Sequence, residues 1–444
     1  MQKTDTPGLK KVLKPIHLWA IAVGLVISGE YFGWNYGWAV SGTVGFLVAT
    51  LLITVLYVTF IFSFTELSTA IPHAGGPFAY AYRAFGPVGG FVSGYATLIE
   101  FLFAPPAIAL ALGSYVHFLY PSIPVLYTAL SSYFVFILIN LLGIKESATF
   151  SLVVTLLAVG ELLLYMGLVA PHFRAENFLA DPLPFGLPGI FAALPFAIWF
   201  YLAIEGVAMV AEEVKDPQRN IPKGYIYGLA TLVLLALGVM VLTGGVTDWH
   251  QLSSIDYPLP EALGVVMGRD NKWTQIFASI GLFGLIASFH GCIIGYSRQV
   301  FALARSGYLP GFLASVNKQF QTPHWALVAG GIVGCLALLT GTTNQVIILS
   351  VLGAVVMYII SMMSLFSLRK KEPDLERPFA APFYPWFPII ALILSVVSLG
   401  AIIYYNLFLS LIFFAGLFFM LGIYLLLGRH RRKITGDALL EIRQ

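Results

Sequence analysis

Four glutamates lie deep inside long apolar stretches of this sequence: Glu30, Glu100, Glu161 and Glu205. An acidic side chain near the middle of a membrane-spanning helix costs roughly 2.5–3.5 kcal/mol on insertion. No Lys or Arg lies in the middle of the same stretches to pair with these acids. They must therefore be protonated, hydrated in a cavity or matched by a bound cation. A protonated carboxyl bonded to a neighbouring helix would explain a single acid, Glu161 above all, but four together favour a path for a positive charge.

Two of these acids sit where small or helix-breaking residues interrupt the apolar pattern. The stretch around Glu30 reads GLVISGEYFGWNYG over residues 24–37, and that around Glu205 reads PFAIWFYLAIEG over residues 195–206. Unwound backbone at membrane depth is tolerated only where it lines a cavity, and such breaks at corresponding places in two halves of a chain indicate a transporter site.

Aromatic side chains crowd both interrupted stretches: Tyr31, Phe32 and Trp34 in the first, Trp199, Phe200 and Tyr201 in the second. A carboxylate surrounded by aromatic faces suits an alkylammonium ion, which is attracted by the charge and by the π systems. The alternative is that these aromatics fill helix crossings, and it is at least as well supported for Trp34 and Tyr36, which lie nearer the membrane interface.

The composition requires a membrane protein to position these residues. Of the 444 residues, 59% are hydrophobic and 10% are charged, and the mean hydropathy is +0.87, which excludes a water-soluble protein. A spanning helix needs about 20 apolar residues, and 12 intervals meet this requirement: 16–40, 43–65, 88–116, 124–143, 147–170, 189–211, 224–244, 273–298, 325–341, 345–368, 385–405 and 408–427.

The distribution of charge predicts the orientation. With both termini in the cytoplasm, all but three of the 24 Lys and Arg residues fall on the inside, the exceptions being Arg174, Arg269 and Lys272. The positive-inside rule therefore favours an even number of spans, and we expect these spans to lie in the cell inner (cytoplasmic) membrane. We expect the first span to be retained, since no signal-peptide pattern precedes it. The net charge of +3 is too small to indicate a nucleic-acid partner.

Other classes of function find little support. The eight histidines are scattered singly, no Ser/His/Asp triad or His/Glu metal-site pattern appears, and Cys292 and Cys335 read as packing residues. We therefore expect no enzyme, no metal and no cofactor. A receptor that binds an amine without moving it is an alternative, although the tail from Arg429 looks too short to hold a signalling domain.

Three motifs add a family resemblance. They are ELSTAIPHAGGPFAY at 66–80, AEEVKDPQRNIPK at 211–223, and SRQVFALARSGYLP at 297–310 with Thr322-Pro323 beyond. Together they resemble the amino acid–polyamine–organocation (APC) superfamily of secondary transporters. The resemblance implies an all-α polytopic fold of 12 transmembrane helices, with a five-plus-five inverted repeat in which helices 1 and 6 are broken, and two C-terminal helices. The parts are a tail at 1–15, repeats at 16–170 and 189–368, helices 11 and 12 at 385–427, and a basic tail at 428–444.

The resemblance also assigns roles. Trp199 matches the aromatic residue that occludes the site in relatives, and Glu205 matches a common acid. Amino-acid carriers usually have Gly-Ser-Gly at the helix 1 break, where this chain has Ser28-Gly29-Glu30. The Glu30 carboxylate would repel the carboxylate of an amino acid, so the departure favours a small amine that lacks one.

The segment at residues 27–37 resembles that of bacterial ethanolamine permeases, which implies import of ethanolamine by alternating access. Its ammonium would bind Glu30 or Glu205, and its hydroxyl would meet Ser28, Tyr95, Glu100 or Ser288. The alternatives are another small organic cation, a diamine or an amino acid. The expected binding residues are Ser28, Gly29, Glu30, Tyr31, Tyr95, Glu100, Trp199 (also the gate), Tyr201, Glu205 and Ser288.

The coupling ion stays open at this stage. Some proton-coupled relatives carry a lysine at the position of Ala158, so that role cannot be transferred. Glu161 or His290 could bind a coupling proton instead, although a packed, neutral His290 is the better supported reading. An inside-negative potential alone supplies roughly 2.3 kcal/mol per charge per 100 mV.

Overall fold

The computed structural model describes residues 11–73, 75–143, 148–317 and 319–431, with side chains as far as residue 426. These residues are helical apart from their connections and contain no β-strand. Nine helical segments within them are long and apolar enough to cross a membrane. They comprise α3 (Tyr36–Ala70), α4 (Pro77–Leu119), α6 (Ala148–Val169), α8 with η2 (Gly186–Trp199 and Ile204–Glu213), α9 (Pro217–Gly244), α12 (Lys272–Arg305), α14 (Thr343–Lys371), α15 (Trp386–Tyr405) and α16 (Leu407–Arg431).

Shorter helices complete the described chain. Four of them are apolar: α1 (Pro15–Val26), α5 (Val125–Leu141), α11 (Pro258–Met267) and α13 (His324–Thr340). The others are α2 (Ser28–Tyr31), η1 (Ala170–His172), α7 (Ala175–Phe178), α10 (Trp249–Leu252) and η3 (Gly311–Ala314). Each interval expected to span the membrane contains a helix, so the fold is that of an all-α polytopic membrane protein.

Two glycines divide helices that are otherwise continuous. Gly42 in α3 has φ 68° and Gly86 in α4 has φ 75°, a backbone region that L side chains rarely adopt. The bend at Gly42 separates the end of the first expected span from the second. The bend at Gly86 separates a short helical part, residues 77–85, from the third expected span.

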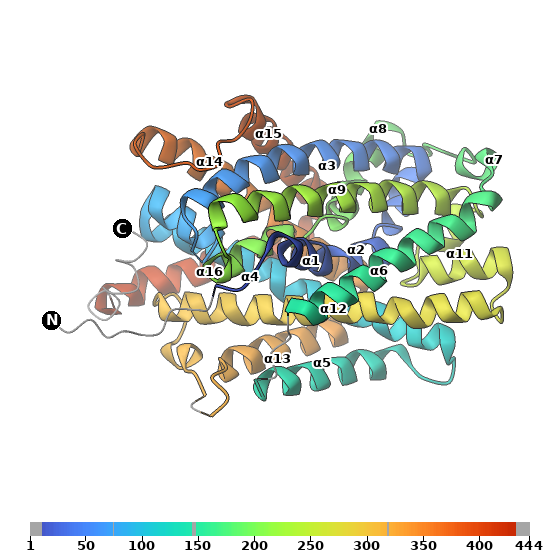
Figure 1. Cartoon of the computed structure of the whole chain (residues 1–444), viewed down its shortest axis with the longest axis horizontal. Helices are drawn as coiled ribbons and strands as arrows, with labels where there is room; N and C mark the ends of the chain where they lie inside the picture. Colours follow the sequence, from blue (N-terminus) through green and yellow to red (C-terminus); the bar gives the residue numbers. More distant parts are fainter. Residues whose placement is uncertain (1–10, 74, 144–147, 318, 432–444) are drawn as a thin grey trace.

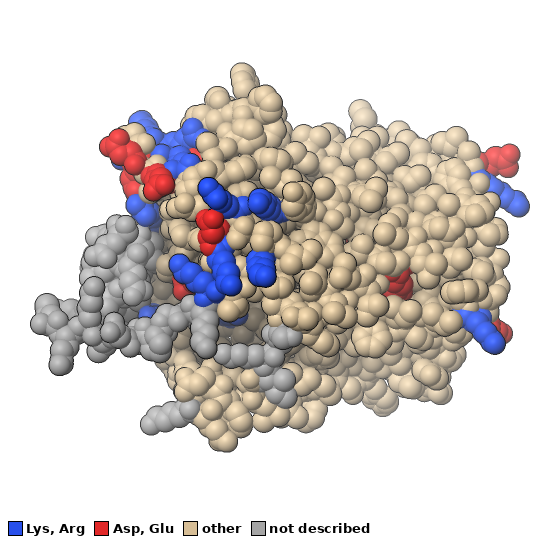
Figure 2. Space-filling view, viewed as in Figure 1, with Lys and Arg blue, Asp and Glu red and all other residues tan. Residues whose placement is uncertain are grey.

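The long helices run side by side along the longest axis, with α1 and α2 in the middle of the bundle (Figure 1). There α1 packs against α6, α9 and α12. The described chain begins and ends toward one end of the bundle, called the terminal end below, and α7 and α11 lie toward the opposite, far end. Lys and Arg side chains gather at the terminal end (Figure 2), which is the asymmetry that the sequence predicted.

Close helix contacts depend on small residues. A Cβ at Gly353 in α14 would lie 2.5 Å from the Ala96 carbonyl oxygen of α4, so this glycine lets the two helices touch backbone to backbone. Inside a bilayer, van der Waals contact of this kind replaces the hydrophobic effect as the main source of helix association.

A buried ionic cluster fastens the terminal end. The Glu66 carboxylate, on a residue only 1% exposed, accepts two hydrogen bonds from the Arg369 guanidinium at 2.8 and 2.6 Å. Arg377 lies 3.2 Å away, and the Ala381 N–H donates at 2.7 Å. The Arg369 guanidinium also stacks 3.8 Å from the Tyr384 ring centre. The cluster joins the end of α3 to α14 and to the α14–α15 connection.

We predict that Glu66→Gln lowers thermal stability, because it leaves two arginines beside a neutral group. Removing one partner of a fully buried pair costs about 3–5 kcal/mol. Both arginine side chains retain solvent contact, at 24% and 14% exposed. We therefore expect the free energy of unfolding to fall by about 1–3 kcal/mol. Glu372→Gln, which breaks the more exposed pair with Arg83, is the control and should cost less. Thermal unfolding of the purified protein checks this, and equal losses would contradict it.

Candidate functional site

The first expected helix break is present in the structure. Helix α1 ends at Val26, and the single turn of α2 follows Ile27. Phe32 then has extended backbone, and Gly33 has φ 90°. Glycine and serine are poor formers of a helix interior, so a stretch that contains several of them is easily interrupted.

The second expected break lies between Trp199 and Ile204. Helix α8 ends at Trp199, and Ala203 takes a left-handed conformation with φ 74°. The chain then continues as the 3₁₀ helix η2. A left-handed residue other than glycine is uncommon and concentrates at functional sites, where the surrounding structure enforces it.

The two breaks touch each other. A Cβ on Gly29 would lie 2.4 Å from the Trp199 carbonyl oxygen, so any larger residue would force the breaks apart. The Trp199 indole N–H donates to the Phe32 carbonyl oxygen at 3.0 Å, and the two rings meet edge to face with centroids 5.6 Å apart. Trp199 therefore ties the end of α8 to the unwound part of the first break.

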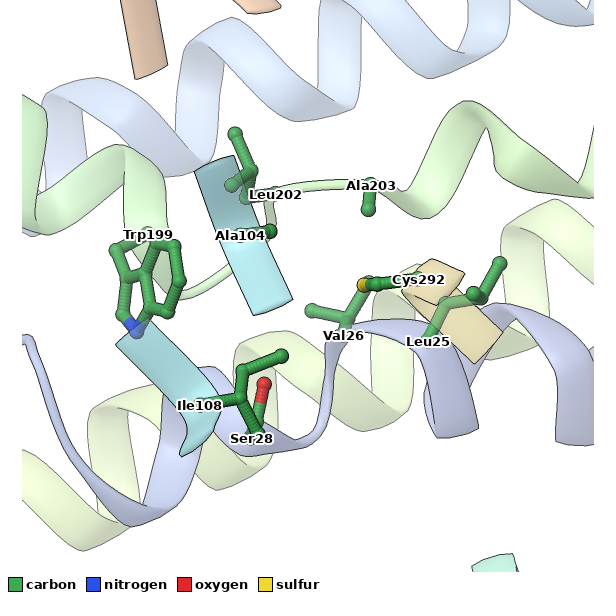
Figure 3. Close-up of a pocket in the computed structure, with 9 residues that line it drawn as sticks. All are labelled: Leu25, Val26, Ser28, Ala104, Ile108, Trp199, Leu202, Ala203 and Cys292. Carbon is green, nitrogen blue, oxygen red and sulfur yellow. The ribbon is translucent and has the colours of Figure 1, made fainter. Parts of the chain in front are cut away.

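A small cavity lies between the breaks (Figure 3). Four parts of the chain line it: α1 with the start of α2, α4, the α8–η2 break, and α12. The lining residues are Leu25, Val26, Ser28, Ala104, Ile108, Trp199, Leu202, Ala203 and Cys292. The cavity has room for about one water molecule, so the site is closed in this conformation.

The cavity includes predicted and unpredicted residues. Ser28 and Trp199 were expected there. Cys292 was expected to be a packing residue, but it lines the cavity, one helical turn from Ser288 on the same face of α12. The four-residue spacing from Ser288 was the feature of the sequence that could have identified Cys292 as a cavity residue. Ala104 and Ile108 of α4 were missed, since nothing in an apolar run marks which face borders a cavity.

Ser28 and Ser288, 260 residues apart in sequence, form a buried hydroxyl pair. Their Oγ atoms are 2.8 Å apart, and the Ser288 hydroxyl lies 2.6 Å from the Leu25 carbonyl oxygen. Helix α12 thereby provides a donor for a carbonyl that the end of α1 leaves free.

Glu30 is fully buried on the first break, but it is not among the residues that line the cavity. No described residue donates a hydrogen bond to either carboxyl oxygen. Its side chain is close enough to Tyr201 to interact electrostatically. The Glu30 carbonyl oxygen accepts from the Trp34 indole at 3.1 Å. The backbone carbonyl of Glu30 thus has a hydrogen-bond donor, whereas the carboxyl group has none among the described residues.

Glu100 and Glu205 are brought together as a pair. Their carboxyl groups are near enough to interact directly, and the Ala203 N–H of the α8–η2 break faces Glu100. No described side chain donates to either carboxyl at normal hydrogen-bond distance. Two such carboxyls cannot both be ionised unless a cation lies between them, and without a cation at least one of them holds a proton. The sequence had assigned Glu205 to the ammonium and Glu100 to a hydroxyl, and it did not pair them.

Glu161 forms a separate contact with the first break. The Tyr31 hydroxyl donates to Glu161 Oε2 at 2.8 Å and lies 3.3 Å from the Ala158 carbonyl oxygen. Tyr115 donates to the Tyr31 carbonyl oxygen at 3.3 Å. The Tyr31 side chain therefore faces α6 and Glu161, although Tyr31 was expected to bind substrate.

The structure places three other predicted residues away from the cavity wall. The Tyr95 hydroxyl donates to the Phe413 carbonyl oxygen of α16 at 3.0 Å, so this hydroxyl is hydrogen-bonded to α16 and not to a group at the cavity. The hydroxyls of Tyr201 and Thr54 are 2.8 Å apart, between the second break and α3. His290 is largely buried against the Phe136 ring of α5.

Comparison with known proteins identifies the family. The family described as amino acid permease matches residues 13–429. The chain belongs to this family. Its members are transporters and not enzymes, so this permease is a multi-pass membrane transporter of the APC superfamily, as its motifs indicated.

Several curated relatives match most of this permease. An uncharacterized transporter of Rhizobium meliloti (strain 1021) is 30% identical over 416 residues, covering 90% of this chain and 88% of the relative. The branched-chain amino acid permease BcaP of Bacillus subtilis (strain 168) is 24% identical, with 88% and 89% covered. The methylthioribose transporter of the same organism is 29% identical, with 74% and 75% covered.

We predict that Gly29→Ala abolishes transport by this permease. The added methyl group would overlap the Trp199 carbonyl oxygen, and overpacking of this kind costs about 1–3 kcal/mol. Gly167→Ala in α6 is the matched control, because a Cβ there meets nothing within 4 Å. Substrate uptake by cells expressing each variant at equal level checks the prediction. Wild-type uptake by Gly29→Ala would show that the breaks separate freely.

Proposed function

We propose that this permease is a secondary transporter that imports a small protonated amine, with ethanolamine as the first candidate, by alternating access. The observation that carries the proposal is Glu30, a fully buried carboxyl on the first helix break with no hydrogen-bond donor among the described residues. A substrate ammonium would supply the missing donor and the missing charge.

The charge balance of the interior supports a cationic substrate. The fully or nearly fully buried ionisable residues in the described part of the chain include Glu30, Glu100, Glu161 and Glu205, but no Lys or Arg. Glu66 is also buried, and it is matched by arginines at the terminal end. The four interior acids thus differ from Glu66 in lacking a protein cation, which favours a positively charged ligand.

The same acids disfavour a zwitterionic substrate. An amino acid would bring its own carboxylate close to Glu30, and two like charges repel strongly at low dielectric. Ethanolamine, another small organic cation or a diamine avoids this conflict. In each case the ammonium would be bound near Glu30 or the Glu100–Glu205 pair, and the Ser28–Ser288 pair offers hydroxyl partners at the cavity.

An amino acid remains the second candidate because of the relatives' names. They include a branched-chain amino acid permease and a methylthioribose transporter of Bacillus subtilis, and a vacuolar cationic amino acid transporter of Arabidopsis thaliana. These named substrates differ in charge, so resemblance to this group alone does not select one of them.

In the proposed cycle the amine enters from the far end and Trp199 closes over it. The broken helices then tilt to release it at the terminal end. This assigns the terminal end to the cytoplasm, where basic residues are expected. The proposed cycle requires the helices to form 12 spans of the inner membrane. Ten of these spans belong to the five-plus-five inverted repeat.

A proton could be coupled to this cycle through Glu161. The Tyr31–Glu161 hydrogen bond links the first break to α6, so a change at the break alters the surroundings of the carboxyl. His290 is the second candidate, and its ring packs against Phe136 of α5. We therefore place coupling at Glu161.

We predict that Glu30→Gln reduces ethanolamine uptake about ten- to a hundredfold, since a hydrogen bond to a charged group contributes about 1.5–3 kcal/mol. Labelled ethanolamine is followed into proteoliposomes with an inside-negative potential, with choline, putrescine, alanine and arginine as competitors. Glu372→Gln, at the terminal end, serves as control. Uptake that survives Glu30→Gln would move the ammonium site to Glu205. Transport of alanine or arginine without ethanolamine would overturn the proposed substrate class.

We also predict that Glu161→Gln uncouples uptake from protons. The amide keeps the shape of the side chain and can accept from Tyr31, but it binds no proton. Uptake driven by an imposed pH gradient should be lost, while counterflow exchange of substrate persists. His290→Gln is the comparison variant. Loss of gradient-driven uptake in His290→Gln alone would reassign the coupling residue.

A further inference from the structure

A hydrogen-bonded junction lies toward the far end of the molecule, beside α11. Asp256, in the connection between α10 and α11, accepts from the Tyr36 hydroxyl through Oδ1 and from the Thr343 hydroxyl through Oδ2, each at 2.7 Å. Tyr36 begins the segment that follows the first break, and Thr343 begins α14. One carboxylate thus joins three parts of the chain that are far apart in sequence.

Asn35 connects this junction to the first break. Its side-chain N–H groups donate to the carbonyl oxygens of Leu252 and Ile255 at 2.6 and 2.8 Å, just before Asp256. Its Oδ1 accepts from the Gly33 backbone N–H at 3.0 Å. Asn35 is fully buried and bonded through both ends of its amide.

The same line of contacts reaches the cavity. Gly33 has positive φ, and a Cβ there would meet the Trp199 indole at 2.5 Å. Trp199 lines the cavity and donates to Phe32, next to Gly33. If Trp199 or the first break is displaced, Gly33 must therefore move with it. Because Asn35 is bonded both to Gly33 and to the residues before Asp256, the movement is passed on to the connection that contains Asp256.

Other contacts hold the edges of this connection to the bundle. The Trp249 indole donates to the Ala180 carbonyl oxygen at 3.1 Å. Tyr257 packs on Phe118 of α4 with ring centroids 5.6 Å apart. These contacts do not involve the first break, so they can persist when the break moves. The bonds of Asn35 and Asp256 are the ones that such a movement would strain.

We propose that Asn35 and Asp256 form a latch that seals the far-end path to the cavity while the first break has the conformation seen here. The inference rests on the proposed alternating-access function, and it adds the residues that decide when the far end is closed. Asp256 is a positioning residue, which acts by holding Tyr36 against the start of α14. Asn35 transmits the state of the break. Opening toward the far end requires that these bonds separate.

The cysteines of the chain allow a direct test. The sequence contains two, Cys292 and Cys335. Cys292 lines the cavity, whereas Cys335 faces an apolar groove between α5 and α13. In a Cys335→Ser background, the rate at which a membrane-impermeant, cationic methanethiosulfonate modifies Cys292 from the external side of oriented vesicles reports how often the far-end path is open.

We predict that Asp256→Ala raises this rate about tenfold, as expected for the loss of about 1.4 kcal/mol of closing free energy from two hydrogen bonds. Tyr36→Phe and Thr343→Val each remove one hydroxyl and should give smaller increases, with no further increase when added to Asp256→Ala. Asp270→Ala is the matched control, because this carboxyl is exposed and lies in the next connection, between α11 and α12. Its modification rate should equal that of the parent.

The outcomes separate the latch from the proposed function. An unchanged rate in Asp256→Ala, with a melting temperature near that of the parent, would overturn the latch even if amine uptake is confirmed. If Asp256→Ala raises the rate of Cys292 modification but the parent protein transports none of the tested amines, the latch is supported and the proposed substrate is rejected. If Asp256→Ala does not fold, Tyr36→Phe and Thr343→Val decide the question, and a parental rate in both would contradict the latch.

Discussion

The structure depends on one constraint, which is that backbone groups freed by a broken helix inside a bilayer must be satisfied by the protein itself. Side chains from other parts of the chain do this at both breaks. Ser288 covers the carbonyl of Leu25, Tyr115 that of Tyr31, Trp199 that of Phe32 and Tyr225 that of Glu205. Because these donors come from several helices, the positions of those helices are fixed relative to the breaks. The cavity lies where the helices converge.

The buried acids divide according to their partners. Glu66 is saturated by arginines and a backbone N–H, and it fastens helix ends in the manner of a structural ion pair. The acids around the breaks lack such partners: Glu30 has no donor among the described residues, Glu100 and Glu205 face each other, and Glu161 is bonded to Tyr31. Desolvated carboxyl groups without protein cations are costly to maintain. Their arrangement around two unwound segments is consistent with use by a ligand or a proton rather than with support of the fold.

The features that the sequence predicted are those encoded locally. Spans follow from runs of apolar residues, and the two breaks follow from glycine, serine and proline within such runs. The missed features depend on contacts between distant segments. Tyr95 reads as a candidate polar partner, yet its hydroxyl is bonded to α16. Cys292 reads as a packing residue, but α12 turns it toward the cavity. Asp256 lies in a connection with no distinctive pattern, and its role appears only when Tyr36 and Thr343 are brought to it by the fold.

The small volume of the cavity has an electrical consequence. A continuous file of water between the two breaks would conduct protons and small ions and would dissipate the membrane potential. Here the space between the breaks holds about one water molecule, and Trp199 and the Ser28–Ser288 pair border it. A cavity of this size holds no such file, so in this conformation the space between the breaks offers neither protons nor small ions a continuous path.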